Sequence, residues 1–305
     1  MDPDFECVVI GGGAAGLSAA LVMGRARRAT LVVDAGRQSN RPDHGIGGLL
    51  GNNGTAPSRF YGEAADEVDR HATVERIDGS VVTAERDDHG FSLTTADRSG
   101  ISAANVILAT GMDYEYPDLP GVAELWGTDA FHCPFCHGWE ARDGRIAVIV
   151  KSPADAMRAR LIQLWSDRVT VLTNGGRLDD EQASTIEAAG LPVISAPVER
   201  LLTENGSLRA VGFADGSEVE FDSVLVPVTM RHRSDLADQL GAEVVEQPAP
   251  FIVDPLKVDL LQQTSVPGLF AAGDIATQGA PSVAAAICEG HRAGAGVVHG
   301  IALGH

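Results

Sequence analysis

The segment that most constrains the fold of this chain is residues 6–36, ECVVIGGGAAGLSAALVMGRARRATLVVDAG. It contains an apolar run, a glycine-rich turn, a stretch of small and apolar residues, and a second apolar run. Short runs rich in β-branched residues predict buried strands, and the stretch between them predicts a helix. This order is typical of a βαβ unit and indicates an α/β fold with a parallel sheet.

The turn has the glycine spacing of a dinucleotide-binding loop. Gly11, Gly13 and Gly16 form G-x-G-x-x-G after the first strand, and Asp34 ends the second strand 18 residues after Gly16. An acid about 20 residues on binds ribose hydroxyls, while the glycines allow a tight turn, a close pyrophosphate and close helix–strand packing. The pyrophosphate then lies at a helix N-terminus. A glycine-rich turn without a ligand is the alternative, and the full strand–turn–helix–strand context disfavours it.

A second segment, residues 144–176, repeats the order of apolar run, turn, amphipathic stretch and apolar run. Two Rossmann-like nucleotide-binding domains of the three-layer ββα type are therefore predicted. Proline-rich stretches at 116–121 and 245–250 indicate crossings between them. We expect a discontinuous first domain and an inserted second domain, with residues 1–116 and 246–305 in the first and residues 117–245 in the second.

The composition limits the partners of the protein. Its formal charge is −19, from 23 Lys and Arg against 42 Asp and Glu, and such a surface repels nucleic acid and anionic lipid. No apolar run reaches the roughly 18 residues of a membrane span. The start, MDPDFECVVI, has acidic residues where a secretory signal has basic ones. We expect a cytoplasmic protein that binds neither nucleic acid nor membrane.

The four cysteines fall into two groups. Cys7 lies in an apolar strand pattern and Cys288 in an alanine-rich helix pattern, so both are predicted to be small core residues. Cys133 and Cys136 instead form a C-x-x-C in FHCPFCHGWE. Such a pair can bind zinc, pack inertly or exchange disulfides.

Redox exchange is the favoured reading of the pair. A structural zinc site needs four ligands, the chain has no second C-x-x-C, and His132 and His137 stand too close in sequence to close a tetrahedron with both thiols. We therefore predict no metal. Inert packing is disfavoured because the pair lies outside any periodic apolar run. Phe135 is expected to pack the segment, and so is Trp139.

Near the C-terminus, GLFAAGDIA predicts a strand that ends at a glycine–aspartate turn, followed by a helix start at APSV. An aspartate in this position can bind a ribityl chain, and the helix dipole can point at a flavin ring. This pattern favours FAD over NAD as the cofactor.

The motifs VVIGGGAAGLSAA, VILATG, the close cysteine pair and TSVPGLFAAGDI occur in that order over essentially the whole chain. In this the chain resembles low-molecular-weight thioredoxin-reductase-like flavoproteins. The resemblance implies an FAD domain split around an inserted domain, redox cysteines before the first strand of the inserted domain, and a homodimer. It also implies a set of FAD contacts, which are Gly11, Gly13, Gly16, Asp34, Gly111, Gly273, Asp274, Ser282 and Val283.

Two departures from the reductase pattern change the expected activity. Thioredoxin reductases have an acid after the second cysteine, whereas His137 stands there in this chain. This form is more similar to the dithiol oxidases of natural-product pathways, such as those that close the disulfides of gliotoxin and holomycin. The turn at residues 151–155, KSPAD, also lacks the glycines of an NADPH loop, so NADPH binding is doubtful.

The resemblance implies that Cys133 faces the substrate and Cys136 faces the flavin. His137 or Glu140 is expected to take up the proton of the reacting thiol. We predict a flavin-dependent enzyme that oxidises a small-molecule dithiol to a disulfide, with O2 as acceptor and hydrogen peroxide as product.

Two alternatives remain open. A thioredoxin-disulfide reductase-like enzyme would run the other way and reduce a protein disulfide with NADPH or with another donor such as ferredoxin. A non-catalytic flavin or nucleotide sensor would leave the intact C-x-x-C unexplained.

Overall fold

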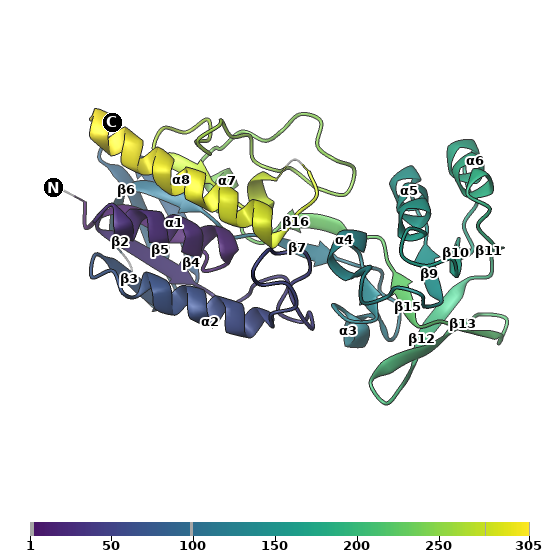
Figure 1. The fold of residues 1–305 in the computed structure, drawn as a ribbon. Helices are drawn as coiled ribbons and strands as arrows, with labels where there is room; N and C mark the ends of the chain where they lie inside the picture. The colour runs from purple at the N-terminus through teal and green to yellow at the C-terminus, as the bar shows by residue number, and fades with distance from the viewer. Residues whose placement is uncertain (1–2, 98–99, 278, 305) are drawn as a thin grey trace. The chain divides into compact units, whose positions relative to one another are not determined.

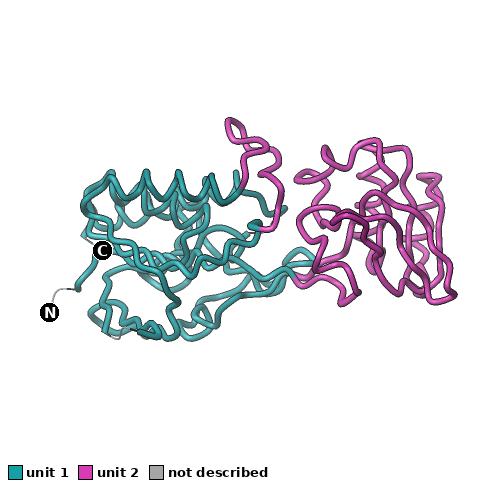
Figure 2. The backbone as a smooth tube through the Cα atoms, turned by 90° about the horizontal axis from the view of Figure 1, so that it is seen from below, with its two compact units in different colours: residues 1–41, 57–114, 230–305 teal, residues 42–56, 115–229 magenta. Residues whose placement is uncertain are grey.

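The computed structural model describes residues 3–97, 100–277 and 279–304. The chain forms two compact units, shown in Figure 2. Residues 230–245, which the sequence analysis assigned to the inserted domain, belong to unit 1, and the short segment 42–56 belongs to unit 2. Unit 1 contains residues 1–41, 57–114 and 230–305, and unit 2 contains residues 42–56 and 115–229.

Unit 1 is built on a seven-stranded sheet with the order β3-β2-β1-β6-β5-β4, in which β17 also pairs with β6 (Figure 1). β1, β2, β3, β6 and β17 form parallel pairs, whereas β4–β5 and β5–β6 are antiparallel. The strands are β1 (Phe5–Ile10), β2 (Thr30–Asp34), β3 (Val74–Asp78), β4 (Val81–Asp87), β5 (Gly90–Thr95), β6 (Ile101–Leu108) and β17 (Leu269–Ala271).

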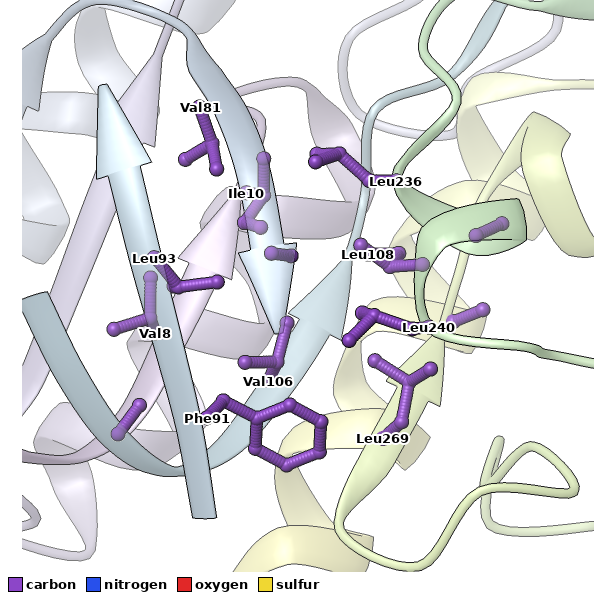
Figure 3. Packing of buried hydrophobic residues seen from close by; sticks show 14 of the residues in the cluster. Val8, Ile10, Val81, Phe91, Leu93, Val106, Leu108, Leu236, Leu240 and Leu269 are labelled. Atoms are coloured by element: carbon purple, nitrogen blue, oxygen red, sulfur yellow. The ribbon is translucent and has the colours of Figure 1, made fainter. Parts of the chain in front are cut away.

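The two faces of β1 enter two different hydrophobic clusters. Val8 and Ile10 pack in the cluster drawn in Figure 3, together with side chains of β4, β5 and α7 (Leu236–Gln239). Cys7 and Val9 pack on the other face against helices. Alternate side chains of a strand point to opposite faces, so an uninterrupted apolar run is what a strand covered on both sides requires. The helices on the Cys7 and Val9 face are α1 (Ala14–Arg25), α2 (Pro57–Val68) and α8 (Val283–Leu303).

Glycines allow α1 to pack closely against its neighbours. A Cβ at Gly16 would lie 1.8 Å from the carbonyl oxygen of Gly11, and a Cβ at Gly290 would lie 2.0 Å from the carbonyl oxygen of Ala15. Both distances are far below van der Waals contact with backbone atoms that cannot rotate away. Gly16 therefore sets the distance between α1 and β1, and Gly290 sets the distance between α1 and α8.

We predict that Gly290→Ala destabilises unit 1 by about 1–3 kcal/mol, because the added methyl group forces α8 away from α1. Gly300→Ala on the same helix is the matched control, because a Cβ there meets no atom within 4 Å. It should leave stability unchanged or raise it by up to about 1 kcal/mol through helix propensity. Thermal unfolding followed by circular dichroism measures both. Equal melting temperatures for the two variants would contradict the packing argument.

Unit 2 contains a five-stranded parallel sheet with the order β11-β10-β9-β15-β8 and a three-stranded antiparallel sheet with the order β12-β13-β14. The strands of the parallel sheet are β8 (Ala130–Phe131), β9 (Ile146–Ile149), β10 (Val169–Leu172), β11 (Val193–Ile194) and β15 (Ser223–Leu225). The others are β12 (Val198–Glu204), β13 (Ser207–Phe213) and β14 (Glu218–Glu220). The helices are α3 (Val122–Leu125), α4 (Pro134–His137), α5 (Pro153–Ile162) and α6 (Asp180–Ala188).

The predicted α/β class with nucleotide-binding folds is confirmed. In both units a parallel sheet carries a strand–turn–helix–strand unit, β1-α1-β2 in unit 1 and β9-α5-β10 in unit 2. The strands β7 (Met112–Glu115) and β16 (Thr229–His232) pair with each other where the chain passes between the units. In the part of the chain that the structure describes, no helix has both the length and the apolar character of a membrane span.

Candidate functional site

The glycine loop of unit 1 leaves the start of α1 open. Gly13 is the N-cap of α1, and no side chain caps this end of the helix. A Cβ at Gly13 would have only the Cγ of Gln38 near it, at 3.9 Å, so there is room above this residue. Gly11 is different, because its φ of +112° and the backbone of Ala109 both exclude a side chain. An uncapped helix start with open space beside it suits an anionic ligand.

Asp34 lies at the end of β2, beside this loop. Its Oδ1 accepts hydrogen bonds from the backbone N–H groups of Gly12 (3.1 Å) and Gly36 (2.9 Å), and its Oδ2 accepts one from Nε2 of Gln38 (3.2 Å). The carboxylate is thus oriented by the loop itself. A carboxylate oxygen has more than one acceptor position, so Oδ2 retains capacity for a ligand hydroxyl.

The parallel order of β1, β6 and β17 brings three predicted glycines to one sheet edge. Gly11 follows β1, Gly111 lies just after β6, and Gly273 lies just after β17. Gly111 has φ +66°, and Gly273 has φ +80° with ψ −156°. Near Gly111, the buried hydroxyl of Thr110 has no hydrogen-bond partner among the described residues. An unsatisfied buried hydroxyl at such an edge is consistent with a ligand that would complete it.

Two carboxyl groups lie at the end of β17. Asp274 begins the 3-10 helix η1 (Asp274–Ala276), is partly buried, and accepts a hydrogen bond from the Tyr114 hydroxyl at 2.9 Å. Burial raises the pKa of Asp274, although the Tyr114 hydroxyl and the charge of Arg233 oppose the shift. Glu289 on α8 accepts a 2.8 Å hydrogen bond from the N–H of Gly273, and burial raises the pKa of Glu289 as well. The backbone N–H of Gly273 is therefore already hydrogen-bonded to Glu289.

The second predicted helix start is observed at α8. This helix begins at Val283, and its N-cap Ser282 accepts a hydrogen bond from the N–H of Ala285 at 3.1 Å. Taken together, unit 1 offers an open helix start, oriented carboxylates and a glycine-lined strand edge. These groups suit an extended ligand that carries both phosphates and hydroxyls, and FAD is such a ligand.

The C-x-x-C of unit 2 forms a disulfide. Cys133 is the N-cap of α4 and Cys136 lies within that short helix, with 5.3 Å between their Cα atoms. Both residues are partly exposed, so a small thiol can reach them. Of the other two cysteines, Cys7 is buried as predicted. The prediction for Cys288 was wrong, because this cysteine is exposed on α8.

The imidazole ring of His137 is buried in the short helix that carries the disulfide. Only 9% of the residue is exposed, and neither ring nitrogen has a hydrogen-bond partner among the described residues. The ring stacks on Phe131 at 5.4 Å between centroids. Its Nε2 lies 3.6 Å from Oδ1 of Asp43, which is too long for a hydrogen bond but short enough for an ion pair if the ring gains a proton. A buried imidazole left unsatisfied costs stability, and such groups are often functional.

Asp43 belongs to the segment 42–56, which packs against the redox helix. A Cβ at Gly47 would lie 2.1 Å from the carbonyl oxygen of Cys136, so the segment can approach α4 this closely only because Gly47 lacks a side chain. The sequence analysis missed Asp43, because no motif surrounds it and it lies 94 positions before His137. Glu140, the other predicted proton acceptor, is exposed.

The aromatic residues of the motif do not pack as expected. Phe135 is 67% exposed and Trp139 is 64% exposed, so the prediction that both pack the segment was wrong. Phe135 contacts Trp165 only edge-on, at 5.9 Å between centroids, and Arg142 lies over the Trp139 ring at 4.2 Å. Phe135 on α4 and Trp139 just after this helix therefore add exposed apolar surface to the segment that carries the disulfide. Among the described residues, no group of three or more His, Cys, Asp or Glu side chains is arranged for a metal ion.

The start of α5 differs from the start of α1. Ser152 is its N-cap and Pro153 its first residue, and Asp155 completes a capping box with Ser152. Oδ2 of Asp155 accepts hydrogen bonds from the N–H groups of Lys151 (3.1 Å) and Ser152 (2.9 Å) and from the Ser152 hydroxyl (2.7 Å). A carboxylate of the protein thus lies where a dinucleotide loop would receive a phosphate.

His132, which precedes the disulfide, is held neutral. Burial lowers the pKa of His132 to about 3, and the charges of Arg158 and His137 add to the shift. Its ring stacks on Trp126 with 5.7 Å between centroids. His137, on the other side of the pair, lies 3.6 Å from the carboxylate of Asp43.

We predict that the ring of His132 does not titrate between pH 8 and pH 5. In the unfolded chain a histidine takes up a proton near pH 6.5, whereas folded His132 does so only near pH 3. The unfolded state then binds more protons, so this residue lowers stability as the pH falls from about 6.5 toward 3. The C2-proton chemical shift of His132 should stay constant over this range, with the urea-unfolded protein as control. A midpoint near 6.5 in the folded protein would contradict the assignment.

A nucleotide-type fold that carries a disulfide-forming C-x-x-C defines a disulfide oxidoreductase. The model of the pyridine nucleotide-disulphide oxidoreductase family matches residues 5–290. The chain belongs to this family and is an oxidoreductase. Thioredoxin-reductase-like members of the family are FAD flavoproteins.

Named relatives cover nearly the whole chain. Thioredoxin reductase tcpT of Claviceps purpurea is 32% identical over 302 residues, which are 95% of this chain and 92% of the relative. The solved structure of HlmI is 35% identical with a TM-score of 0.91 and covers 98% of this chain and 92% of its own. The oxidoreductase from Agrobacterium tumefaciens is 33% identical with a TM-score of 0.91, and both chains are covered completely. The resemblance to thioredoxin-reductase-like flavoproteins is thus confirmed.

Proposed function

We propose that this protein is an FAD-dependent dithiol oxidase that converts a small-molecule dithiol into a disulfide and passes the electrons to O2. The observation that carries the proposal is the partly exposed Cys133–Cys136 disulfide beside His137, a buried imidazole with unsatisfied nitrogens 3.6 Å from Asp43. A thiol must lose its proton before it attacks a disulfide. His137 is the base for that proton, and Asp43 stabilises the imidazolium that results.

The proposed exchange has two steps. One substrate thiolate attacks Sγ of Cys133, the Cys133–Cys136 bond breaks, and Cys136 leaves as a thiolate. The second substrate thiolate then attacks the substrate sulfur of the mixed disulfide and releases Cys133. The substrate loses two electrons and two protons, and the cysteine pair gains the two electrons. The FAD that the glycine loop and Asp34 would hold would supply a two-electron acceptor for the cysteine pair, and O2 with the same two electrons and two protons would give hydrogen peroxide.

The FAD contacts remain those expected from the sequence. We propose that the glycine loop and Asp34 hold the ADP part, that Gly111 closes the adjoining strand edge, and that the pyrophosphate and ribityl region lies against Gly273 and Asp274, with Asp274 as the polar contact. Ser282 and Val283 begin the helix proposed to point at the flavin ring. Asp274 is partly buried and has a raised pKa, and its carboxyl group suits a hydrogen bond with a ribityl hydroxyl.

The start of α5 supports an oxidase rather than an NADPH-dependent reductase. An incoming pyrophosphate would meet the carboxylate of Asp155, which already accepts the N–H groups of Lys151 and Ser152. The two negative groups repel each other at short range. The second candidate, reduction of a protein disulfide, is favoured by the names of relatives such as thioredoxin reductase tcpT. A donor other than NADPH, such as ferredoxin, would remain compatible with it.

The direction of the reaction can be tested on the purified yellow protein. We expect a small dithiol such as dithiothreitol to reduce the flavin without oxygen and to drive equimolar O2 uptake and peroxide release in air. Micromolar NADPH should leave the flavin oxidised. Mass spectrometry of the released cofactor should identify FAD. Rapid bleaching by NADPH with no dithiol-dependent oxygen uptake would favour the reductase instead.

The roles of the side chains can be tested by substitution. His137→Ala should lower kcat for dithiol oxidation by about 10²–10⁴-fold, as expected for a lost acid–base group. Asp43→Asn should lower it by less, because the imidazolium loses its counter-charge but the base remains. Glu140→Gln is the matched control, because Glu140 is exposed. Oxygen uptake measures all three. A larger loss in Glu140→Gln than in His137→Ala would transfer the role of base to Glu140.

The two cysteines should also differ. In Cys136→Ser the remaining Cys133 thiolate should attack the disulfide form of the substrate, release one substrate thiol and leave a mixed disulfide that mass spectrometry detects, while dithiol turnover is lost. In Cys133→Ser no such stable adduct should form at the same substrate concentration. The reverse pattern would exchange the two roles, and full activity of the double serine variant would remove the pair from the mechanism.

A further inference from the structure

One arginine of unit 2 connects the start of α5 to the redox segment. Nη1 of Arg158 donates a hydrogen bond to the backbone carbonyl of His132 at 3.0 Å. Nη2 of the same guanidinium forms an ion pair and hydrogen bond with Oδ1 of Asp155, one turn earlier on α5. The carbonyl of His132 belongs to the peptide unit whose N–H is that of Cys133. Arg158 therefore bridges α5 and the backbone immediately before the first redox cysteine.

The anchor of this bridge is rigid. The Asp155 side chain is only 4% exposed, and its other oxygen accepts two backbone N–H groups and a hydroxyl at the start of α5. Asp155 can hardly reorient without leaving buried donors of that turn unsatisfied, which is costly. The Arg158 side chain is 22% exposed, and its planar guanidinium binds the His132 carbonyl and the Asp155 carboxylate at the same time. A lysine ammonium is a point charge and does not reproduce such a fork.

We propose that Asp155 and Arg158 are positioning residues that hold the His132–Cys133 peptide, so that Cys133 stays within bonding reach of Cys136. The proposal rests on the redox role proposed above for this cysteine pair. In this chain the turn that would receive a nucleotide phosphate in a reductase carries an internal carboxylate instead. That carboxylate serves the disulfide through the arginine.

The bridge has a consequence for the disulfide equilibrium. Cys136 is held from the other side, by α4 and by the close approach of Gly47 to its carbonyl oxygen. Fixing Cys133 as well raises the effective concentration of one thiol toward the other and favours the disulfide over the dithiol. Loss of the guanidinium charge alone would act in the opposite direction, because a nearby cation stabilises a thiolate and hence the reduced pair. If Arg158 acts by positioning Cys133, its loss lowers the equilibrium constant for disulfide formation. If it acts only through its charge, its loss raises this constant.

The test is the redox equilibrium of the pair in the full-length flavoprotein. The protein is equilibrated without oxygen in glutathione buffers, in which two glutathione thiols become one glutathione disulfide as the cysteine pair gains two electrons and two protons. Trapping with an alkylating reagent and peptide mass spectrometry then give the fraction of Cys133 and Cys136 reduced. Arg158→Met should lower the equilibrium constant for disulfide formation about tenfold, which corresponds to about 30 mV. This readout needs neither a substrate nor turnover, so it can fail or succeed independently of the proposed oxidase activity.

Three further variants make the result decisive. Arg158→Lys keeps the charge but loses the fork, so it should shift the constant in the same direction as Arg158→Met. Asp155→Asn keeps the shape of the anchor and should give a smaller shift of the same sign, which also tests the proposal if Arg158→Met fails to fold. Arg160→Met is the matched control on the exposed side of α5 and should leave the constant unchanged. An unchanged or raised constant in a folded Arg158→Met protein, full rescue by lysine, or an equal shift in Arg160→Met would overturn the proposal.

Discussion

The close approach of α1 to its neighbours is the constraint on which unit 1 depends. The helix lies between β1 and α8, and at Gly16 and Gly290 the backbones come so near that only a hydrogen atom fits. This packing places the uncapped start of α1 at the carboxyl edge of the sheet, where β1, β6 and β17 also end. Two glycines of the loop therefore differ. Gly16 allows close backbone packing, whereas Gly13 lies beside open space.

The sequence predicted the βαβ units, the class of fold and the disulfide-forming pair, because each depends on a local pattern of apolar runs, glycines and cysteine spacing. It could not predict Asp43, Tyr114 or Glu289, since these side chains reach His137, Asp274 and Gly273 only through the tertiary fold. Exposure was also beyond local patterns. Phe135, Trp139 and Cys288 are all exposed, although their sequence surroundings predicted packing.

The helices α1 and α5 occupy equivalent places in the two βαβ units but differ in how the N–H groups at their starts are satisfied. The start of α1 has no capping side chain, while the start of α5 is closed by Ser152 and Asp155. The free N–H groups of a helix start carry partial positive charge, and either a ligand or a side chain can satisfy them. The Ser152–Asp155 pair thus satisfies at the start of α5 the kind of backbone groups that no side chain satisfies at the start of α1, without a change of fold.

The course of the chain limits how the redox module can be transferred. Residues 42–56 belong to unit 2, although β2 before them and α2 after them belong to unit 1. A graft of residues 115–229 into another scaffold would carry both cysteines and His137 but leave Asp43 and Gly47 behind. The two segments of unit 2 are separated in the sequence, so transfer of residues 115–229 alone would carry the disulfide and His137 without the carboxylate that lies 3.6 Å from this histidine.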